Sequence, residues 1–253
     1  MTWPPAGIKW AYADEFTALA HGDTFLLTPQ IRAAVKFDHV ITDPPYSENT
    51  HKNAQTNADK AQGKKLMTFD SITVEKLREF FGSFSVERWV IATMEWRHVG
   101  ALEAEPPNGL KFLRFGVWVK TNGMPQISAD RPAQGWEAIA YMHSRREASR
   151  WNGGGKSGNY VGAIEPGKHP TNKPLPLLMQ FVRQFTDNGE VIFDPFAGGG
   201  TTLVAAKKMG RRAIGIELDA EHVETCSERL KATKQTHFDG ERSADKREQQ
   251  EFL

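Results

Sequence analysis

Four consecutive residues, Asp43, Pro44, Pro45 and Tyr46, combine a carboxylate, two rigid prolines and an aromatic ring directly after a short β-rich run. The prolines fix the backbone and have no N–H group to donate, so hydrogen-bond acceptors predominate here. An ionised Asp43 and a nearby main-chain carbonyl can together accept both hydrogens of one amino group, and the Tyr46 ring can stack on a planar base. This combination predicts a site for an exocyclic amino group on a heterocycle.

A second motif lies at residues 190–202, which read EVIFDPFAGGGTT: a predicted strand, a glycine-rich turn and the start of a helix. Consecutive glycines let the backbone approach a ligand closely. Glu217 ends the next predicted strand, where a carboxylate can accept hydrogen bonds from both hydroxyls of a ribose. Because the turn does not spell G-x-G-x-x-G, it predicts a nucleoside ligand and not a pyrophosphate. A tight structural turn beside an incidental acid is the alternative.

The elements that would position these motifs alternate between strands and helices, which favours an α/β domain with a mostly parallel sheet. Short β-rich runs that suit buried central strands lie at 37–43, 88–93, 190–194 and 212–217. Two looser runs that suit an antiparallel pair at the sheet edge lie at 112–120 and 137–144. Apolar spacing and capping residues predict helices at 72–81 (with Ser71 as the N-cap), 177–185, 201–209 and 220–231.

The chain has 253 residues, of which 39% are hydrophobic and 25% charged, as is typical of a globular protein. We expect one catalytic domain at 1–233 and a charged, disordered tail at 234–253. Because the net charge is only +1, any affinity for nucleic acid must come from locally concentrated basic residues. The single cysteine, Cys226, excludes an internal disulfide and argues against a thiolate zinc site. Short apolar runs and the lack of a secretory signal predict a cytoplasmic protein.

Two patterns look like binding motifs but lack the required spacing. Residues 155–157 read GKS, as at the end of a phosphate-binding loop, but Arg150 stands where that loop needs its first glycine. The 8 histidines do not have the spacing of metal ligands. The sequence therefore predicts neither a nucleotide triphosphatase nor a metal site.

DPPY at 43–46 together with DPFAGGGTT at 194–202 resembles the amino-group DNA methyltransferases that use S-adenosylmethionine. With DPPY first and the cofactor block near the C-terminus, the order resembles their circularly permuted β class. HPTNKP at 169–174 resembles the HPTxKP element of that class, and VWVK at 117–120 and WE at 136–137 resemble its middle strands. The resemblance implies a Rossmann-like methyltransferase fold, in which helices flank a central, mostly parallel sheet.

The resemblance also implies a role for each motif. The catalytic residues that grip the target base would be Asp43, Pro44, Pro45 and Tyr46. The residues around S-adenosylmethionine would be Asp23, His169, Thr171, Lys173, Asp194, Phe196, Gly198, Gly200, Thr201 and Glu217. Among these, Thr171 and Lys173 would approach the methionine carboxylate, and Asp23, which fits better than Asp14, would lie near the cofactor adenine. No metal is implied.

The expected chemistry is direct methyl transfer to an amino nitrogen. A base inside a duplex cannot present that nitrogen in line with a sulfonium, so the target nucleotide would have to flip out. Two acceptors that pull on the amino hydrogens would make the nitrogen more tetrahedral, and no covalent intermediate would be needed. Carbon-5 methylation of cytosine would need a thiolate, and Cys226 lies in a predicted helix away from any Pro-Cys element.

Two basic segments are predicted to contact double-stranded DNA: a flexible loop at 47–65 and a small target-recognition insertion at about 121–168. The candidate contacts are Lys52, Lys60, Lys64, Lys65, Arg145, Arg146, Arg150, Trp151 and Lys156. The arginines would read guanine edges, and Trp151 would stack or fill the gap left by the flipped base. The small size of the insertion predicts either a short recognition site or a homodimer that shares the duplex.

Aspartate before the prolines favours adenine N6 as the acceptor, because the similar family usually has serine there for cytosine N4; cytosine N4 is the alternative. An inactive DNA-binding regulator, and methylation of RNA or of protein glutamine, are further alternatives. Nothing resembles a nuclease, so we expect modification without cleavage. The last residues, among them Gln249, Phe252 and Leu253, resemble peptides that dock on bacterial sliding clamps, although an inert tail is the alternative.

Overall fold

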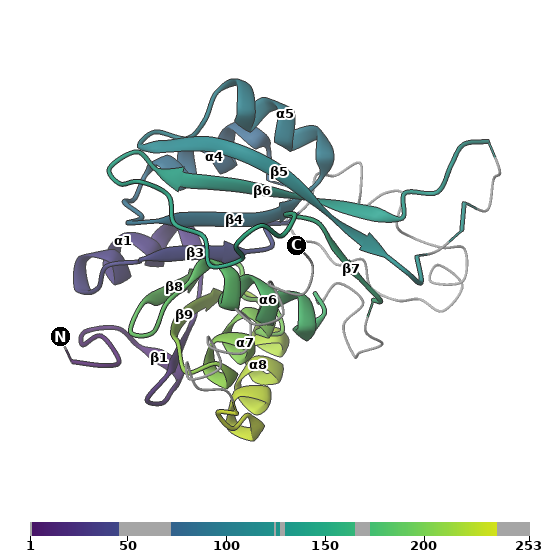
Figure 1. Ribbon diagram of the computed structural model, residues 1–253. Helices are drawn as coiled ribbons and strands as arrows, with labels where there is room; N and C mark the ends of the chain where they lie inside the picture. Colours follow the sequence, from purple (N-terminus) through teal and green to yellow (C-terminus); the bar gives the residue numbers. More distant parts are fainter. Residues whose placement is uncertain (1, 46–71, 124, 127–129, 165–172, 237–253) are drawn as a thin grey trace.

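The computed structural model describes residues 2–45, 72–123, 125–126, 130–164 and 173–236. Its centre is a nine-stranded sheet with the order β1-β2-β9-β8-β3-β4-β6-β5-β7 (Figure 1). Several predicted site residues lie outside the described residues and stay predictions: Tyr46, Lys52, Lys60, Lys64, Lys65, His169 and Thr171. The same holds for the last residues, which resemble clamp-binding peptides.

The sheet is mostly parallel, as expected. Its strands are β1 Trp10–Ala13, β2 Thr17–His21, β3 His39–Thr42, β4 Trp89–Met94, β5 Leu110–Lys120, β6 Trp136–Ser144, β7 Tyr160–Gly162, β8 Val191–Asp194 and β9 Arg212–Glu217. The pairs β2–β9, β9–β8, β8–β3 and β3–β4 are parallel. Strand β6 runs antiparallel to both β4 and β5. The β-rich runs therefore form the central strands that the sequence predicts.

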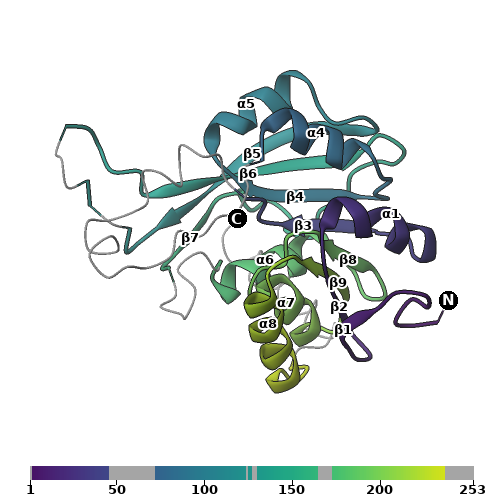
Figure 2. The ribbon, with the colours of Figure 1, turned by 180° about the vertical axis from the view of Figure 1, so that it is seen from behind.

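Helices cover both faces of the sheet and bury two apolar clusters (Figures 1 and 2). One face carries α1 Thr24–Ala34, α4 Val74–Gly82 and α5 Trp96–Ala104. The other face carries α6 Leu175–Phe185, α7 Thr201–Lys208 and α8 Ala220–Ala232. This is the Rossmann-like α/β arrangement. None of the described helices is both long enough and apolar enough to cross a membrane.

Several elements differ from the sequence-based prediction. The sequence did not predict the short strands β1, β2 and β7 or the helices α1 and α5. Their apolar residues do not repeat with a clear strand or helix period. Helix α4 begins at Val74, and its N-cap is Thr73, whose side chain accepts from the Lys76 N–H, so the prediction of a helix from residue 72 is wrong. The β5–β6 pair is antiparallel as predicted, but β7 pairs beyond β5 and forms the edge.

The segment predicted as a small target-recognition insertion, at about 121–168, contains both β6 and β7. Strand β6 lies between β4 and β5, and β7 pairs in parallel with Trp118–Lys120 of β5. Removing this segment would take two strands out of the sheet. Any recognition surface here must be formed by the loops between strands.

The chain leaves the neighbouring strands β3 and β8 in opposite directions. After β3 it continues to α4 on one face, and after β8 it continues to α7 on the other face. A crevice opens at the carboxyl ends of parallel strands where the connections diverge in this way, and ligands bind there in open α/β sheets. The fold therefore directs attention to Asp43 and Asp194, which lie at these two strand ends.

Candidate active site at the carboxyl ends of β3 and β8

The last residue of β8, Asp194, is buried at this strand end. Its Oδ1 accepts a hydrogen bond from Thr42 Oγ1 at 2.7 Å, and from the Phe196 N–H at 3.2 Å. Burial raises the pKa of the Asp194 carboxyl to about 6, although hydrogen bonds from Thr202 and Thr42 oppose the shift. Asp194 thus joins the ends of β3 and β8 and begins the glycine-rich turn.

Two glycines shape the turn for different physical reasons. Gly198 has a φ of +50° and Gly200 a φ of +76°, and both values lie in the left-handed region. A Cβ on Gly200 would lie 2.2 Å from Cys226 Sγ, so only glycine fits against α8. A Cβ on Gly198 would meet no atom within 4 Å. The turn is therefore packed on its Gly200 side and open beside Gly198.

Glu217, at the end of β9, lies next to Gly198 of this turn. Its carboxylate accepts from the Gly198 N–H and from the Asp219 N–H, both at 2.7 Å. The side chain is only 8% exposed, and the Gly22 N–H donates to the Glu217 main-chain carbonyl at 2.9 Å. Because each carboxylate oxygen has more than one lone pair, Glu217 can also accept from a ligand hydroxyl.

Asp23 follows β2 at the same edge of the sheet, since His21 pairs with Glu217. Its side chain caps α1 by accepting from the Phe25 N–H at 2.8 Å. Asp14 instead precedes β2 at the opposite edge, where Lys207 Nζ lies 2.5 Å from it. Burial opposes ionisation of Asp14, but hydrogen bonds from Lys207 and Tyr12 lower its pKa to about 2. Of these two aspartates, only Asp23 lies at the edge that carries the glycine-rich turn.

Asp43 follows β3, and both of its carboxylate oxygens have partners. Thr93 Oγ1, from β4, donates to Oδ1 at 2.6 Å, and Lys173 Nζ, just before α6, donates to Oδ2 at 2.5 Å. Lys173 Nζ also lies 3.1 Å from Glu137 Oε2 of β6. The prediction that Lys173 meets a cofactor carboxylate stays a prediction, and in the structure its ammonium contacts Asp43 and Glu137.

The cysteine and the histidines do not form a competing reactive centre in the described part of the chain. Burial raises the pKa of the Cys226 thiol to about 12, so a thiolate is unfavourable there. Among the described residues there is no group of three or more histidine, cysteine, aspartate or glutamate side chains that could hold a metal ion. Among the described residues, the reactive groups near Asp43 and Asp194 are therefore carboxylates, hydroxyls and lysine ammonium groups.

Comparison with known proteins agrees with this geometry. The profile of the DNA methylase family matches residues 141–228, which include the glycine-rich turn and Glu217. The type II methyltransferase M2.DpnII of Streptococcus pneumoniae is 30% identical over 253 residues, covering 87% of this chain and 91% of that protein. The chain belongs to the amino-group DNA methyltransferases.

Solved structures of related proteins have the same fold as this methyltransferase. The M1.HpyAVI–SAM complex is 25% identical, with a TM-score of 0.65 over 85% of this chain and 98% of that chain. The cytosine-N4-specific PvuII DNA methyltransferase is 16% identical with a TM-score of 0.66, over 88% of this chain and 89% of that one. At that identity the second match supports the fold alone.

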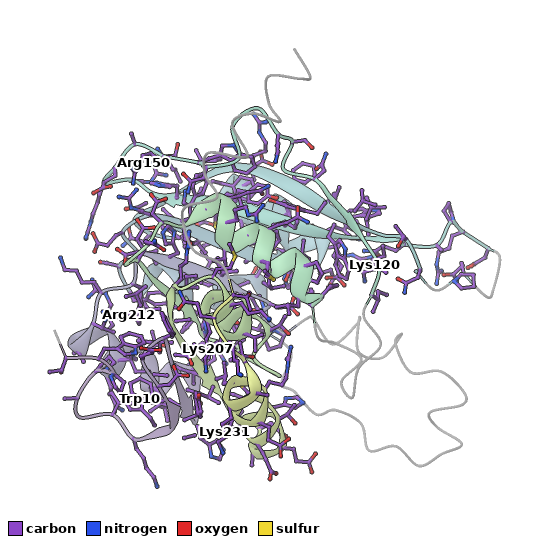
Figure 3. All side chains as sticks on the ribbon, turned by 60° about the horizontal axis from the view of Figure 1, so that its bottom comes forward. Trp10, Lys120, Arg150, Lys207, Arg212 and Lys231 are labelled. Carbon is purple, nitrogen blue, oxygen red and sulfur yellow. The ribbon has the colours of Figure 1, made fainter. Side chains whose placement is uncertain are left out.

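Three of the arginines predicted to contact DNA lie at the edge of the sheet opposite Asp43. Strand β6 runs antiparallel to β4, so the segment after Ser144 emerges at the amino end of β4, opposite Asp43. There Arg145 Nε donates to the Leu110 carbonyl, Arg146 contacts Ser85, and Arg150 pairs with Asp187. Figure 3 shows Arg150 and Lys120 toward opposite ends of the molecule. The structure therefore separates these arginines from Asp43, and their contact with DNA stays a prediction.

Trp151 makes contacts within the protein that the sequence did not predict. Its ring packs edge-on against Phe185 at a centroid distance of 5.1 Å, and its Nε1 donates to the Gly154 carbonyl at 2.8 Å. A Cβ on Gly153 would lie 2.2 Å from the Trp151 ring. Trp151 therefore anchors its own loop, and its stacking on a base stays a prediction. Lys156 is exposed, and its contact with DNA stays a prediction.

The structure adds residues to the site that the sequence did not predict. Thr93 donates a hydrogen bond to Asp43 directly, and Glu137 contacts Lys173, which in turn contacts Asp43. Glu137 belongs to the WE pair that resembles a middle strand of the family. Trp96 and Arg97 begin α5 directly after β4, at the same edge, and the Arg97 guanidinium lies 4.6 Å from the Trp96 ring centroid. The signal in the sequence was a tryptophan next to an arginine shortly after the predicted strand at 88–93.

Proposed function

We propose that this methyltransferase transfers a methyl group from S-adenosylmethionine to N6 of an adenine that has flipped out of double-stranded DNA. The observation that carries this proposal is the position of Asp43. Its carboxylate lies at the end of β3, next to the strand that leads into the glycine-rich turn, and is held from two sides by Thr93 and Lys173. An acceptor fixed in this way suits an amino group as substrate.

The glycine-rich turn fits the nucleoside part of S-adenosylmethionine. The open side of Gly198 leaves room for a ligand next to the backbone, and Glu217 is fixed where ribose hydroxyls can donate to it. Asp23 and Phe196 would border the adenine, and Thr201 and Asp194 the rest of the pocket. The solved SAM complex of M1.HpyAVI supports this assignment. When bound, the cofactor supplies a methyl group on a positively charged sulfonium.

The base-binding half would act by orientation and hydrogen bonding. Asp43 accepts one amino hydrogen, the Pro44 carbonyl accepts the other, and Tyr46 stacks on the flipped base. This pattern directs the nitrogen lone pair toward the methyl group and polarises the N–H bonds, so that electron density shifts onto the nitrogen. The amino proton leaves after transfer, and an ionised Asp43 is the acceptor nearest to it. Orientation and electrostatics together supply the rate enhancement.

The DNA surface would lie around the loops at the carboxyl edge of the sheet. Trp96 is 47% exposed there, and Arg97, whose side chain is 64% exposed, is held by Glu95 at 2.5 Å. Arginine can contact phosphate and tryptophan can stack on an unpaired base. These two residues replace Arg145, Arg146, Arg150 and Trp151 as the proposed contacts among the described residues. A shared duplex in a homodimer remains part of the proposal.

Adenine is favoured over cytosine N4 by Asp43, where serine would be expected for cytosine. The test is to incubate the full chain with S-adenosylmethionine and plasmid DNA, digest the DNA to nucleosides and identify the product by mass spectrometry. N6-methyldeoxyadenosine is expected, and Asp43→Ala serves as the inactive control. N4-methyldeoxycytidine as the sole product would overturn the choice of base. Methylation of RNA or protein without methylation of DNA would overturn the proposal as a whole.

A further inference from the structure

Four alternating charges connect Asp43 to β5 at the active edge: Asp43, Lys173, Glu137 and Lys120. Building on the proposed function, we infer that Lys173 and Glu137 are positioning residues: Lys173 keeps the Asp43 carboxylate ionised and oriented for the target amino group, and Glu137 holds the Lys173 ammonium in place. Lys173 lies just before α6, Glu137 is on β6 and Lys120 ends β5. Neither Lys173 nor Glu137 needs to touch the base to act in this way.

The distances show a continuous chain of contacts. Lys173 Nζ lies 2.5 Å from Asp43 Oδ2 and 3.1 Å from Glu137 Oε2. Lys120 Nζ lies 2.5 Å from Glu137 Oε1, and Thr93 Oγ1 holds the other oxygen of Asp43 at 2.6 Å. Each oxygen of Asp43 is thus fixed by a donor from a different element. The carboxylate cannot rotate without breaking one of these two hydrogen bonds.

Asp43 is more exposed than the two charged residues behind it. The Asp43 side chain is 29% exposed, whereas those of Glu137 and Lys173 are only 15% and 8% exposed. The ammonium is therefore behind the carboxylate, and Asp43 is the member of this trio with most surface left for a substrate. A solvent-exposed ion pair would be screened by water, but this one acts across a poorly hydrated region.

A buried group of charges is costly to fold, because each charge loses its hydration. Apolar residues of similar volume would often stabilise a fold equally well or better. Stability alone therefore gives little reason to place an ammonium between two carboxylates at a strand end. Strongly perturbed charges at a ligand-binding edge are typical of functional sites, and here they converge on the proposed acceptor.

Among the described residues, the charged and polar side chains that act on Asp43 are Glu137, Lys173, Thr93 and Asp194. Burial raises the pKa of the Asp43 carboxyl and the Glu137 charge raises it further, whereas Lys173 and the Thr93 hydroxyl lower it. Asp194 also carries a charge close enough to interact with Asp43. Burial alone would lower the pKa of Lys173, but the Asp43 and Glu137 carboxylates raise it above its usual value.

The two positioning residues therefore act on Asp43 in opposite directions. Lys173 favours the ionised carboxylate directly, because a positive charge in contact stabilises a negative one. Glu137 disfavours it by charge repulsion, but holds the Lys173 ammonium in place. An Asp43 that took up a proton would lose acceptor capacity at the atom that must bind the target amino hydrogen. The acid side of the pH–rate profile should therefore depend on the opposing effects of Lys173 and Glu137 on the ionisation of Asp43.

The experiment measures single-turnover methylation of a DNA duplex by the full chain, at saturating S-adenosylmethionine, between about pH 5 and 8.5. Lys173→Met should move the acid limb of the rate profile to higher pH by at least about one unit. Glu137→Gln should move it to lower pH. Lys173→Arg, which keeps the charge, should leave the limb close to that of the wild type. Lys231→Met, the same change at an exposed position on α8, is the matched control.

Lys173→Met leaves two facing carboxylates, so it can fail to fold. The double variant Lys173→Met with Glu137→Gln removes both buried partners, and its limb should lie between those of the single variants. Rates that fall in all variants without any movement of the limb would overturn the inference, because a structural role changes amplitude and not the titration. Failure of the wild-type chain to methylate DNA would instead count against the proposed function.

Discussion

Thr42 Oγ1 donates to Asp194 Oδ1 at 2.7 Å, although the two residues are 152 positions apart in the sequence. Thr42 ends β3, directly before Asp43, and Asp194 ends β8, at the start of the glycine-rich turn. This hydrogen bond therefore joins the proposed base-binding half to the proposed cofactor-binding half. It gives a structural reason why an amino group and a methyl donor would meet at a fixed separation.

Replacing Asp43 should affect catalysis far more than cofactor binding. Asp43→Ala removes the acceptor for the target amino group, so single-turnover methylation should fall at least about 100-fold, on the order of 3 kcal/mol. Affinity for S-adenosylmethionine, measured by calorimetry, should stay within about tenfold. An Asp43→Ala variant that methylates DNA at the wild-type rate would show that the proposed mechanism is wrong.

Replacing Glu217 should have the opposite pattern. Glu217→Ala removes the proposed ribose acceptor and leaves the Gly198 and Asp219 N–H groups without their carboxylate partner. The dissociation constant for S-adenosylmethionine should rise about tenfold or more, and high cofactor concentration should restore part of the rate. Unchanged cofactor affinity, measured on a variant that circular dichroism shows to be folded, would contradict this assignment.

The buried Asp194 should make stability depend on pH in a defined direction. Its pKa is raised to about 6, so the folded chain binds this proton more tightly than the unfolded chain does. The contribution of Asp194 to stability therefore falls as the pH rises from about 4 to about 6, by up to about 3 kcal/mol. Asp194→Asn cannot ionise but keeps an oxygen that can accept from Thr42.

Thermal melts of Asp194→Asn and wild type test this linkage. Relative to wild type, the variant should gain stability between about pH 4 and pH 6, and the difference should be constant above that window. A difference that does not change with pH would mean that the carboxyl has no raised pKa in the folded chain.

The two glycines of the turn should respond differently to alanine. Gly200→Ala brings both a left-handed φ and a Cβ 2.2 Å from Cys226 Sγ, whereas Gly198→Ala brings only the φ, a cost of about 1–2 kcal/mol. Gly200→Ala should therefore lower the melting temperature more. Adding Cys226→Ala should restore part of the loss, which a double-mutant cycle can measure. Gly198→Ala should mainly weaken S-adenosylmethionine binding, because its Cβ enters the open side of the turn.

DNA affinity should depend on the edge of the sheet that carries Asp43. Arg97→Ala and Trp96→Ala should weaken binding to a DNA duplex, and Arg97→Ala should also reduce the salt slope of binding by about one. Arg150→Ala, at the opposite edge, is the control and should bind as the wild type does. Fluorescence anisotropy at several salt concentrations measures both. A loss for Arg150→Ala alone would place DNA on the other edge.

The sequence by itself was enough to predict the fold class and the two motifs of the site. Buried strands such as β8 and β9 are short, nearly continuous apolar runs, and the glycine-rich turn follows β8 within a few residues, so local patterns specify them. Asp43 and Glu217 were identified because each directly follows or ends such a run. Such strands and turns are determined by residues close together in the sequence, so the sequence is enough to predict them.

Only the tertiary structure decided which distant residues face these motifs. The reversal of β6 relative to β4 carried Arg145, Arg146, Arg150 and Trp151 to the edge away from Asp43, although they are close to the expected place in the sequence. The same antiparallel pairing brought Glu137, at the start of β6, to the edge where Lys173 meets Asp43. Strand direction and order depend on the packing of the whole sheet, so no single segment encodes them.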